Sequence, residues 1–152
     1  MVRGSRKNSF MEYTMATKMI QLSGAVKWVH IDPPDLKYGK KYTVNLYLDD
    51  VNMKAYLDSG LQLKINEDED GKFVRIRRDD MKLIKGESVI FGPPKVEGAE
   101  PSEIGNGSEV TCLIAVYDTV KGPGHRLEKV IVNRLVEYIP IEGQEAPDVD
   151  LQ

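Results

Sequence analysis

Apolar and polar residues alternate along several short stretches of the chain, a pattern typical of half-buried β-strands. In residues 41–48 every second side chain is apolar, and the positions between them, which are expected to point away from the core, hold Lys41, Thr43, Asn45 and Tyr47. Residues 73–79 alternate in the same way, with Val74 and Ile76 toward the core. Further strands are predicted at 19–31, 108–118 and 127–139, and a short one at 61–65.

Residues that break strands and begin helices divide these stretches. The first strand is expected to bend at Gly24 and to end at the prolines of 32–35, because proline cannot donate to a strand ladder. Asp49-Asp50 followed by VNMKAYLDSG is predicted to form a short helix that an aspartate N-cap begins and Gly60 ends. The residues at helical spacing, expected to form its buried stripe, are Met53, Tyr56 and Leu57.

The connections are predicted to be one hairpin and one long irregular segment. The acidic run Glu67–Asp70 followed by Gly71 is a polar turn that joins the short strand 61–65 to the strand 73–79. Residues 80–107 are rich in glycine and proline and are expected to be irregular, with one extended piece around 88–96. Residues 121–125 are expected to form a turn or a mobile loop.

Five main strands and one short helix indicate an all-β protein. The expected fold is a five-stranded Greek-key barrel, the OB-fold. A chain of 152 residues fits one such domain, placed at 15–140. Residues 1–14 are expected to be an expression leftover or a disordered extension; as a native arm, their basic side chains could contact an anion. Residues 141–152 are expected to be an acidic, disordered C-terminal tail.

Charge is distributed unevenly along a chain whose net charge is -3. Residues 1–14 hold three basic side chains and one acidic, whereas residues 99–152 hold four basic and ten acidic. This distribution excludes a uniformly basic nucleic-acid binder but not a local basic patch.

Metal and catalytic motifs are poorly supported, and no cofactor is expected. Cys112 is the one cysteine and lies in an apolar strand, where it is expected to be a small buried side chain. His30 and His125 lack the spacing of a zinc site, and Glu67–Asp70 is favoured as a solvated turn over a calcium loop. The sequence shows no nucleotide-binding loop, no membrane span and no secretory signal, so a cytoplasmic protein without enzymatic activity is expected.

Aromatic and cationic side chains share the expected outer faces of two strands. Phe73, Arg75 and Arg77 alternate with the core residues of their strand, and the strand 41–48 adds the polar set named above. Single-stranded nucleic acid suits such a face, because rings stack bases and cations neutralise phosphates. Arg78, Lys27 and Trp28 are further candidates. The alternative is that the rings pack under a loop and the arginines pair with nearby aspartates.

The order of these motifs resembles that of the single-stranded DNA-binding proteins of tailed bacteriophages. The likeness spans residues 19–140 and includes YTVNLYLDD, the helix VNMKAYLDSG, EDEDGKFVRIRRD, FGPPKVEG, GNGSEV and GPGH before the last strand. The resemblance implies an OB-fold that coats DNA in phage replication, recombination and repair, inside the host cytoplasm. It also implies an acidic C-terminal tail that recruits replication proteins, although this tail has only four acidic residues in its last fifteen.

The residues expected to hold single-stranded DNA follow from this combined interpretation. Phosphate contacts are assigned to Lys41, Arg75 and Arg77, with Arg78 and Lys27 outside them. Base stacking is assigned to Tyr47 and Phe73, and also to Trp28; Thr43 and Asn45 are expected to hydrogen-bond. Two alternatives stay open: an OB-type module that binds protein or oligosaccharide, and a nuclease that uses Glu67–Asp70 with a divalent ion. The protein is expected to act as a monomer or a homodimer.

Overall fold

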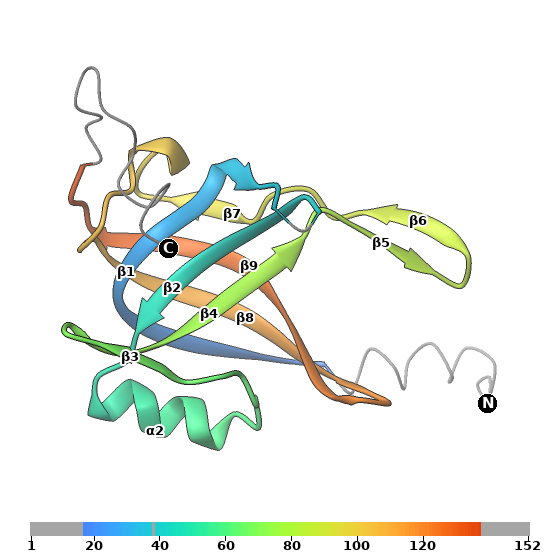
Figure 1. Ribbon diagram of the computed structural model, residues 1–152, viewed down its shortest axis with the longest axis horizontal. Helices are drawn as coiled ribbons and strands as arrows, with labels where there is room; N and C mark the ends of the chain where they lie inside the picture. The colour runs from blue at the N-terminus through green and yellow to red at the C-terminus, as the bar shows by residue number, and fades with distance from the viewer. Residues whose placement is uncertain (1–16, 38, 138–152) are drawn as a thin grey trace, which may run out of the picture.

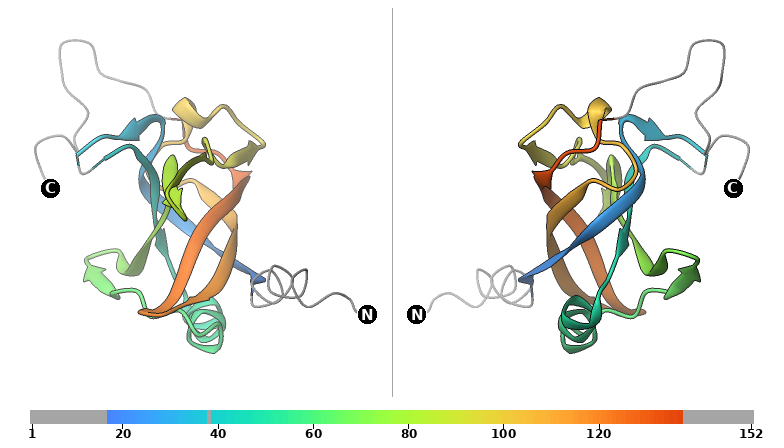
Figure 2. Two further views of the ribbon diagram at one scale, coloured as in Figure 1. Left: turned by 90° about the vertical axis from the view of Figure 1, so that its right-hand side faces the viewer. Right: turned by 90° about the vertical axis from the view of Figure 1, so that its left-hand side faces the viewer.

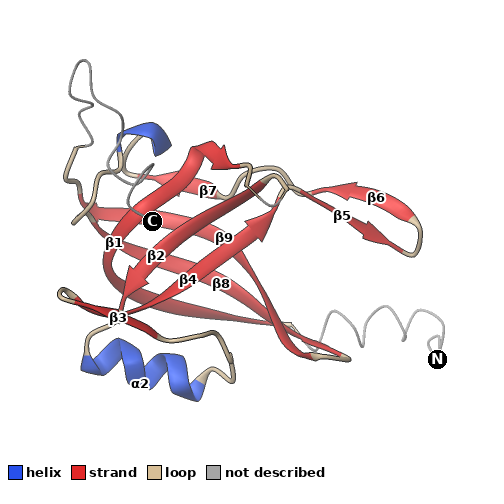
Figure 3. Cartoon of the chain, in the orientation of Figure 1, coloured by secondary structure: helices blue, strands red, loops and turns tan. Residues whose placement is uncertain are grey.

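The computed structural model describes residues 17–37 and 39–137, and its elements are mostly strands (Figure 1). In chain order the strands are β1 (Lys18–Asp35), β2 (Lys41–Tyr47), β3 (Asn66–Asp68), β4 (Gly71–Asp79), β5 (Met81–Ile84), β6 (Glu87–Ile90), β7 (Lys95–Glu97), β8 (Glu109–Thr119) and β9 (Gly122–Arg134). Within the described ranges there is one α-helix, α2 (Asp50–Asp58), and one 3-10 turn, η1 (Pro101–Glu103) (Figure 3). The predicted all-β character with one short helix is confirmed.

Seven strands form one curved sheet in the order β3-β4-β2-β1-β8-β9-β7, and β5 and β6 form a separate hairpin. The five long strands β4, β2, β1, β8 and β9 are neighbours and antiparallel, and the sheet curls around the core with α2 at one end (Figure 2). The predicted closure into a barrel is wrong, because β4 and β9 meet without a strand ladder. Side chains join them instead: the His125 imidazole accepts the Arg77 backbone N–H, and the Arg78 guanidinium donates to the Leu127 carbonyl.

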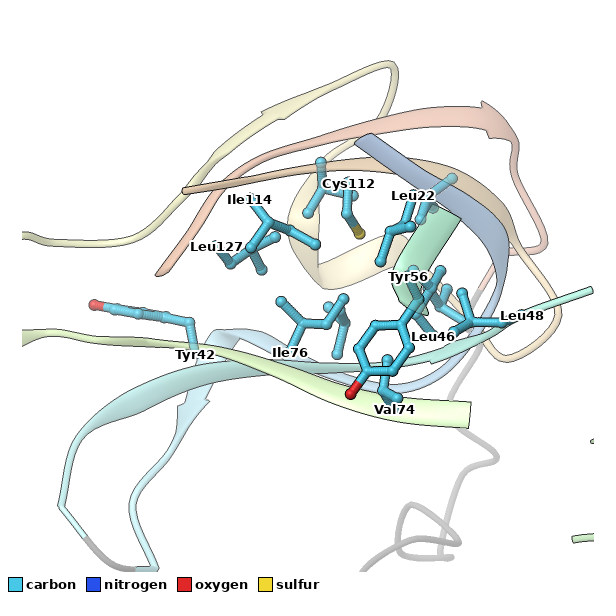
Figure 4. Close-up of a cluster of buried hydrophobic side chains, with 14 of the residues drawn as sticks. Leu22, Tyr42, Leu46, Leu48, Tyr56, Val74, Ile76, Cys112, Ile114 and Leu127 are labelled. Atoms are coloured by element: carbon cyan, nitrogen blue, oxygen red, sulfur yellow. The ribbon is translucent and has the colours of Figure 1, made fainter. Parts of the chain in front are cut away.

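The core fills the inside of this curved sheet (Figure 4). Alternate residues of β2 and β4 lie there as predicted: Val44, Leu46, Val74 and Ile76 are each 0% exposed. Cys112 of β8 is also fully buried, as expected, and burial raises the pKa of its thiol to about 12. A thiol held neutral in this way behaves as an apolar side chain and not as a nucleophile.

The helix α2 begins and ends where the sequence predicts. The Asp49 side chain accepts a hydrogen bond from the Asn52 backbone N–H at 2.8 Å, and Gly60 follows the helix with a φ of 88°. Tyr56 is buried, and its hydroxyl donates to the Leu63 carbonyl at 2.9 Å. The predicted burial of Leu57 is wrong: it is 62% exposed, because only a narrow side of this short helix meets the sheet.

Strand β1 is longer than predicted. It continues through Pro33 and Pro34 to Asp35, with irregular register to β2 over these residues. At Gly24 β1 approaches β2 so closely that a Cβ atom would lie 1.9 Å from the Tyr47 carbonyl oxygen. Only glycine allows this contact.

The connections differ most from the prediction. The hairpin before β4 exists, but its first strand is Asn66–Asp68 and not 61–65. The segment expected to be irregular holds the β5–β6 hairpin and β7, which runs parallel to β9. The final strand starts at Gly122, five residues earlier than predicted, so that 122–125 belong to β9. No helix within 17–37 and 39–137 is long and apolar enough to span a membrane.

Candidate nucleic-acid interface

Strands β2 and β4 are direct neighbours, as the expected site requires. Asn45 lies between Lys27 of β1 and Arg75 of β4, and Tyr47 lies opposite Phe73. Residues paired in this way point to the same face of an antiparallel sheet. The predicted outer-face residues of the two strands therefore come together on the side of the sheet opposite the core.

The prediction that Thr43 and Asn45 lie exposed is wrong, because they are only 3% and 4% exposed. Both belong to a central strand, and the longer side chains of the flanking strands cover them. The Arg75 Nε donates to the Asn45 Oδ1 at 3.0 Å, so Asn45 orients the guanidinium above it.

Tyr47 is also buried, at 8% exposure, which contradicts its expected position as an open stacking ring. Its ring centroid lies 4.9 Å from that of Phe73, which is half-buried, and its hydroxyl donates to Asp68 at 2.5 Å. Burial and this hydrogen bond raise the pKa of Tyr47. Lys27 lies 5.4 Å from the Tyr47 ring centroid and pairs with Asp70.

We call this group of Lys27, Tyr47, Asp68, Asp70 and Phe73 the aromatic end of the face. The hydrogen bond to Asp70 raises the pKa of Lys27, and the Tyr47 hydroxyl lowers the pKa of Asp68. Each charge therefore already has a partner. The carboxylates of Asp68 and Asp70 in the acidic turn are bound by the Tyr47 hydroxyl and the Lys27 ammonium. They are therefore not free to bind a metal ion.

Beyond Arg75 the outer face opens into a groove of about 560 Å³ between β4, the β8–β9 turn and the base of the β5–β6 hairpin. We call it the cationic groove. It is lined by Leu63, Arg75, Arg77, Asp79, Lys82, Phe91, Tyr117, Thr119, Lys121, Pro123, Gly124, His125 and Arg126. Five of these side chains are cations and one is a carboxylate.

The cations of the groove differ from Lys27 in their partners. Within the described part of the chain, the side chains of Arg75, Arg77 and Lys121 form no ion pair. Lys82 donates to the Tyr117 hydroxyl at 3.2 Å, and this neutral partner does not neutralise the charge of the ammonium. Arg126 pairs with Glu128 at 2.6 Å. Like charges in a partly enclosed groove raise the local potential and attract an anion.

Two aromatic rings line the groove, and cations contact both. The Arg126 guanidinium lies 4.7 Å from the Phe91 ring centroid, and the Lys82 ammonium lies 5.6 Å from that of Tyr117. Such contacts hold flexible cationic side chains beside flat apolar surfaces. The groove therefore offers both a phosphate-binding charge and surfaces on which a base can stack.

His125 lies at the floor of the groove, where β9 meets β4. Its Nε2 accepts the Arg77 backbone N–H at 3.1 Å. Burial, with the positive charges of Arg77 and Lys82, lowers the pKa of His125 to about 4, although Asp79 opposes this. The imidazole is therefore neutral near pH 7, as an acceptor at Nε2 must be.

Arg78 faces the other way and is a structural residue, which contradicts its expected role as an outer phosphate contact. Its guanidinium donates to the carbonyls of Gly92 at 2.7 Å, Phe91 at 2.8 Å and Leu127 at 3.1 Å, and it pairs with Glu128 at 3.2 Å. Only 11% of the side chain is exposed. Arg78 thus joins β4 to β9 where the ladder is missing.

Trp28 and Lys41 lie outside the cationic groove. Trp28 is half-buried in β1 with a φ of 51°, and its backbone N–H donates to the Asn106 Oδ1 at 2.8 Å. Lys41 is half-buried at the start of β2, opposite Asp79 of β4. Their assignment to nucleic-acid binding stays a prediction.

Sequence reasoning missed most of the groove. The added residues are Lys82, Phe91, Tyr117, Lys121, His125 and Arg126. One signal was available: 121–126 place a lysine, a histidine and an arginine at a glycine-rich turn between two long strands. Among the described residues, no three histidine, cysteine, aspartate or glutamate side chains lie close enough together to hold a metal ion.

A second hollow of about 450 Å³ lies near the aromatic end, between β1, the start of α2 and the β3–β4 turn. Its charged lining residues are Asp49, Asp70, Glu109 and Lys72. Acidic side chains outnumber basic ones here, so the two hollows of the sheet differ in the sign of their charge.

Comparison with known proteins gives a similarity among solved structures. No protein-family model matches the sequence, and no curated protein matches it. Among solved structures the chain is similar to the "Single-stranded DNA-binding protein from bacteriophage Enc34", with a TM-score of 0.49 and 16% sequence identity. The similarity covers 88% of this chain and 89% of that one.

Proposed function

We propose that the protein binds single-stranded DNA without sequence preference and that the strand lies in the cationic groove. The observation that carries this proposal is the composition of the groove, whose lining includes five cationic side chains, two aromatic rings and only one carboxylate. A polyanion with unstacked bases matches both features, because phosphates need the cations and bases need the rings. A neutral oligosaccharide would use the rings and leave the charge surplus unexplained.

The roles of the residues follow from their contacts. Arg75, Arg77 and Lys121 contact phosphates, since their charges are not paired within the described residues. The rings of Phe91 and Tyr117 stack against bases, and the side chains of Arg126 and Lys82 lie beside these rings. Asn45 holds Arg75 in position through its side-chain carbonyl. Lys41 and Trp28 extend the path of the strand beyond the groove. Phe73 and Lys27 extend it toward the aromatic end but contribute less, because they already contact Tyr47 and Asp70.

The scaffold that we propose is an OB-type fold, with β1, β2, β4, β8 and β9 as its five strands. In such folds the ligand crosses the second and third strands and the loop between the fourth and fifth. With β2 and β4 as strands two and three, and the β8–β9 turn as that loop, the cationic groove occupies the corresponding place. This agreement supports the Greek-key assignment.

The biological role that we propose is to coat and protect single-stranded DNA during phage replication, recombination and repair in the host cytoplasm. The expected tail 141–152 and the segment 1–14 lie outside the described residues, so recruitment of replication proteins by the tail rests on the sequence resemblance. A protein that coats DNA needs no catalytic group, and the acidic turn, the best nuclease candidate, holds Tyr47 and Lys27.

The test is a salt titration of binding to a fluorescent oligo(dT), with duplex DNA and single-stranded RNA as parallel ligands. The anisotropy isotherms should give a log–log slope of about -0.7 for each phosphate that the protein neutralises. Replacing Arg75 and Arg77 by glutamine should weaken binding to every sequence alike and flatten the slope by roughly 1.4. The matched control is Lys54→Gln together with Lys64→Gln, two exposed lysines outside the groove.

Other outcomes would identify the rival functions. Equal binding to duplex DNA would remove the preference for unpaired strands. Binding of a protein or sugar that is insensitive to salt, with no DNA binding, would favour the interaction module. Cleavage of labelled DNA with Mg²⁺, abolished by changing Glu67 and Asp70, would show a nuclease.

A further inference from the structure

Strand β1 contains a bulge next to Lys27. The register to β2 shifts between Lys27, which lies opposite Asn45, and His30, which lies opposite Thr43. Both of these β2 residues point away from the core, so Lys27 and His30 share that outer face. Residues three apart in a regular strand point to opposite faces, so β1 has one extra residue at this place.

The extra residue is Trp28. Val29 packs against the core, whereas Trp28 is not among the described side chains that do so. The backbone of Trp28 has a φ of 51°, in the left-handed region that a bulky residue rarely adopts. The bulge thus takes the one tryptophan of the chain out of the core and leaves its side chain half-buried.

The loop 105–108 holds this strained backbone in place. The Asn106 Oδ1 accepts the Trp28 backbone N–H at 2.8 Å. The backbone of the loop also pairs with Val26, just before the bulge, through two hydrogen bonds of 2.8 and 2.9 Å. Ser108 anchors the loop, since it is fully buried. Strained backbone persists only where its surroundings fix it, and it is typical of functional sites.

The bulge lies on the face of the sheet that leads to the cationic groove. Two rows of paired residues cross β1, β2 and β4 there: Lys27, Asn45 and Arg75, and His30, Thr43 and Arg77. Trp28 lies between the β1 ends of the two rows, and Arg75 and Arg77 line the groove at the other ends. Two strand spacings, about 10 Å, separate β1 from β4. A polynucleotide that leaves the groove across β2 therefore reaches the bulge.

We propose that Asn106 is a positioning residue, which holds Trp28 so that the indole stacks on a base of the strand that leaves the cationic groove. This inference rests on the proposed DNA binding. Asn106 acts through Trp28 and not on the DNA: its side chain fixes the bulge, and the bulge sets the direction of the ring. A ring that is fixed before binding loses less conformational entropy when a base stacks on it.

The test uses the fluorescence of Trp28, because the full chain has one tryptophan. Stacking on a base quenches indole emission, so oligo(dT) should quench wild type over the concentration range in which anisotropy shows binding. Asn106→Ala should weaken binding by about fivefold or more, as for the loss of one stacked base, and should at least halve the quenching at saturation. The salt slope should not change, because no phosphate contact is lost.

Three further variants separate positioning from a general structural effect. Asn106→Asp keeps an oxygen acceptor and should retain the wild-type quenching at saturation. Trp28→Ala should weaken binding, and adding Asn106→Ala to it should change the affinity by less than about twofold. Ser102→Ala, at an exposed residue of the neighbouring turn η1, should leave affinity and quenching as in wild type.

The possible failures are distinguishable. No binding of oligo(dT) by wild type would overturn the proposed function and this inference with it. Binding by wild type without quenching of Trp28 would overturn the inference alone. So would an equal loss of affinity from Asn106→Ala with and without Trp28, because Asn106 would then act independently of the ring. Asn106 is exposed, so Asn106→Ala is expected to fold. Asn106→Ser, whose side chain is too short to reach the Trp28 N–H, is the second variant.

Discussion

At the aromatic end of the β2–β4 face, Lys27 and Tyr47 meet Asp70 and Asp68, whereas Arg75 and Arg77 share the cationic groove with Lys82 and Lys121. Both regions contain rings and cations on the same side of one sheet. In the first, each polar group has a partner and the ring is buried. In the second, the charges repel one another, and an anion would relieve that repulsion. The comparison teaches that the presence of rings and cations does not identify a binding site, whereas their state of pairing does.

The largest expected effect concerns Tyr47. Tyr47→Ala should lower the free energy of unfolding by about 3–5 kcal/mol, because it removes a large buried side chain, and urea unfolding measures this. Tyr47→Phe keeps the ring and loses the hydrogen bond to Asp68, so it should fold and bind oligo(dT) like wild type. A tenfold loss of affinity for oligo(dT) in Tyr47→Phe at unchanged stability would show that Tyr47 contacts DNA.

The second prediction concerns pH. The pKa of His125 is about 4 in the folded protein and 6.5 without the fold, so the unfolded chain binds more protons between these values. The stability that His125 contributes is full above pH 6.5 and is lost as the pH falls toward 4, by at most roughly 3 kcal/mol. His125→Gln stays neutral, so its melting temperature should depend less on pH across this window.

Burial lowers this pKa most, the charges of Arg77 and Lys82 lower it further, and Asp79 raises it, so the size of the pH effect reports chiefly how well the fold buries the imidazole. Wild type and His125→Gln should differ little in slope between pH 7 and 8, which is the internal control. Identical slopes for the two proteins between pH 6.5 and 4 would contradict the buried position of His125 beside Arg77 and Lys82.

The third prediction compares two phenylalanines. Phe91→Ala should weaken oligo(dT) binding by about 1–3 kcal/mol, the usual loss when one stacking ring is removed. Phe73→Ala, at the aromatic end, should weaken binding less and destabilise the fold, because its ring packs on Tyr47. Anisotropy at fixed salt and thermal melting separate the two effects. The reverse order of binding losses would move the DNA path to the aromatic end.

The smallest expected effect separates two lysines. Lys121→Gln should reduce the salt slope of binding by about 0.7, as for the loss of one phosphate contact. Lys27→Gln should leave the slope almost unchanged, because Asp70 already neutralises that charge. Equal changes in slope for both variants would show that the ion pair at the aromatic end opens when DNA binds.

Much of the fold could be predicted from alternation, because a buried face imposes a strict period of two. Val44, Leu46, Val74 and Ile76 lie in the core as expected, and an aspartate caps the helix as expected, namely Asp49. Alternation shows to which side a residue points but not what covers it. The long side chains of neighbouring strands bury Asn45, and no local pattern contains that information.

The rest depends on contacts between distant segments. The cationic groove combines residues around 75–79, 82, 91 and 117–126, which only the strand order brings together. The β5–β6 hairpin was missed because its turn is Lys85–Gly86, whereas Asn-Gly and Asp-Gly are the strong hairpin signals. Its exposed Leu83 and Ile90 also contradict the rule that apolar residues mark the core.

The seam between β4 and β9 has a consequence for local unfolding. One guanidinium, that of Arg78, and one imidazole hold the two strands together where the ladder is missing. Amides of a continuous ladder exchange with solvent deuterium only in large openings, whereas an amide held by a single side chain exchanges in a small one. The Arg77 amide is thus expected to exchange with solvent deuterium long before the Val44 amide. The contact between β4 and β9 is expected to be the first part of the domain to open.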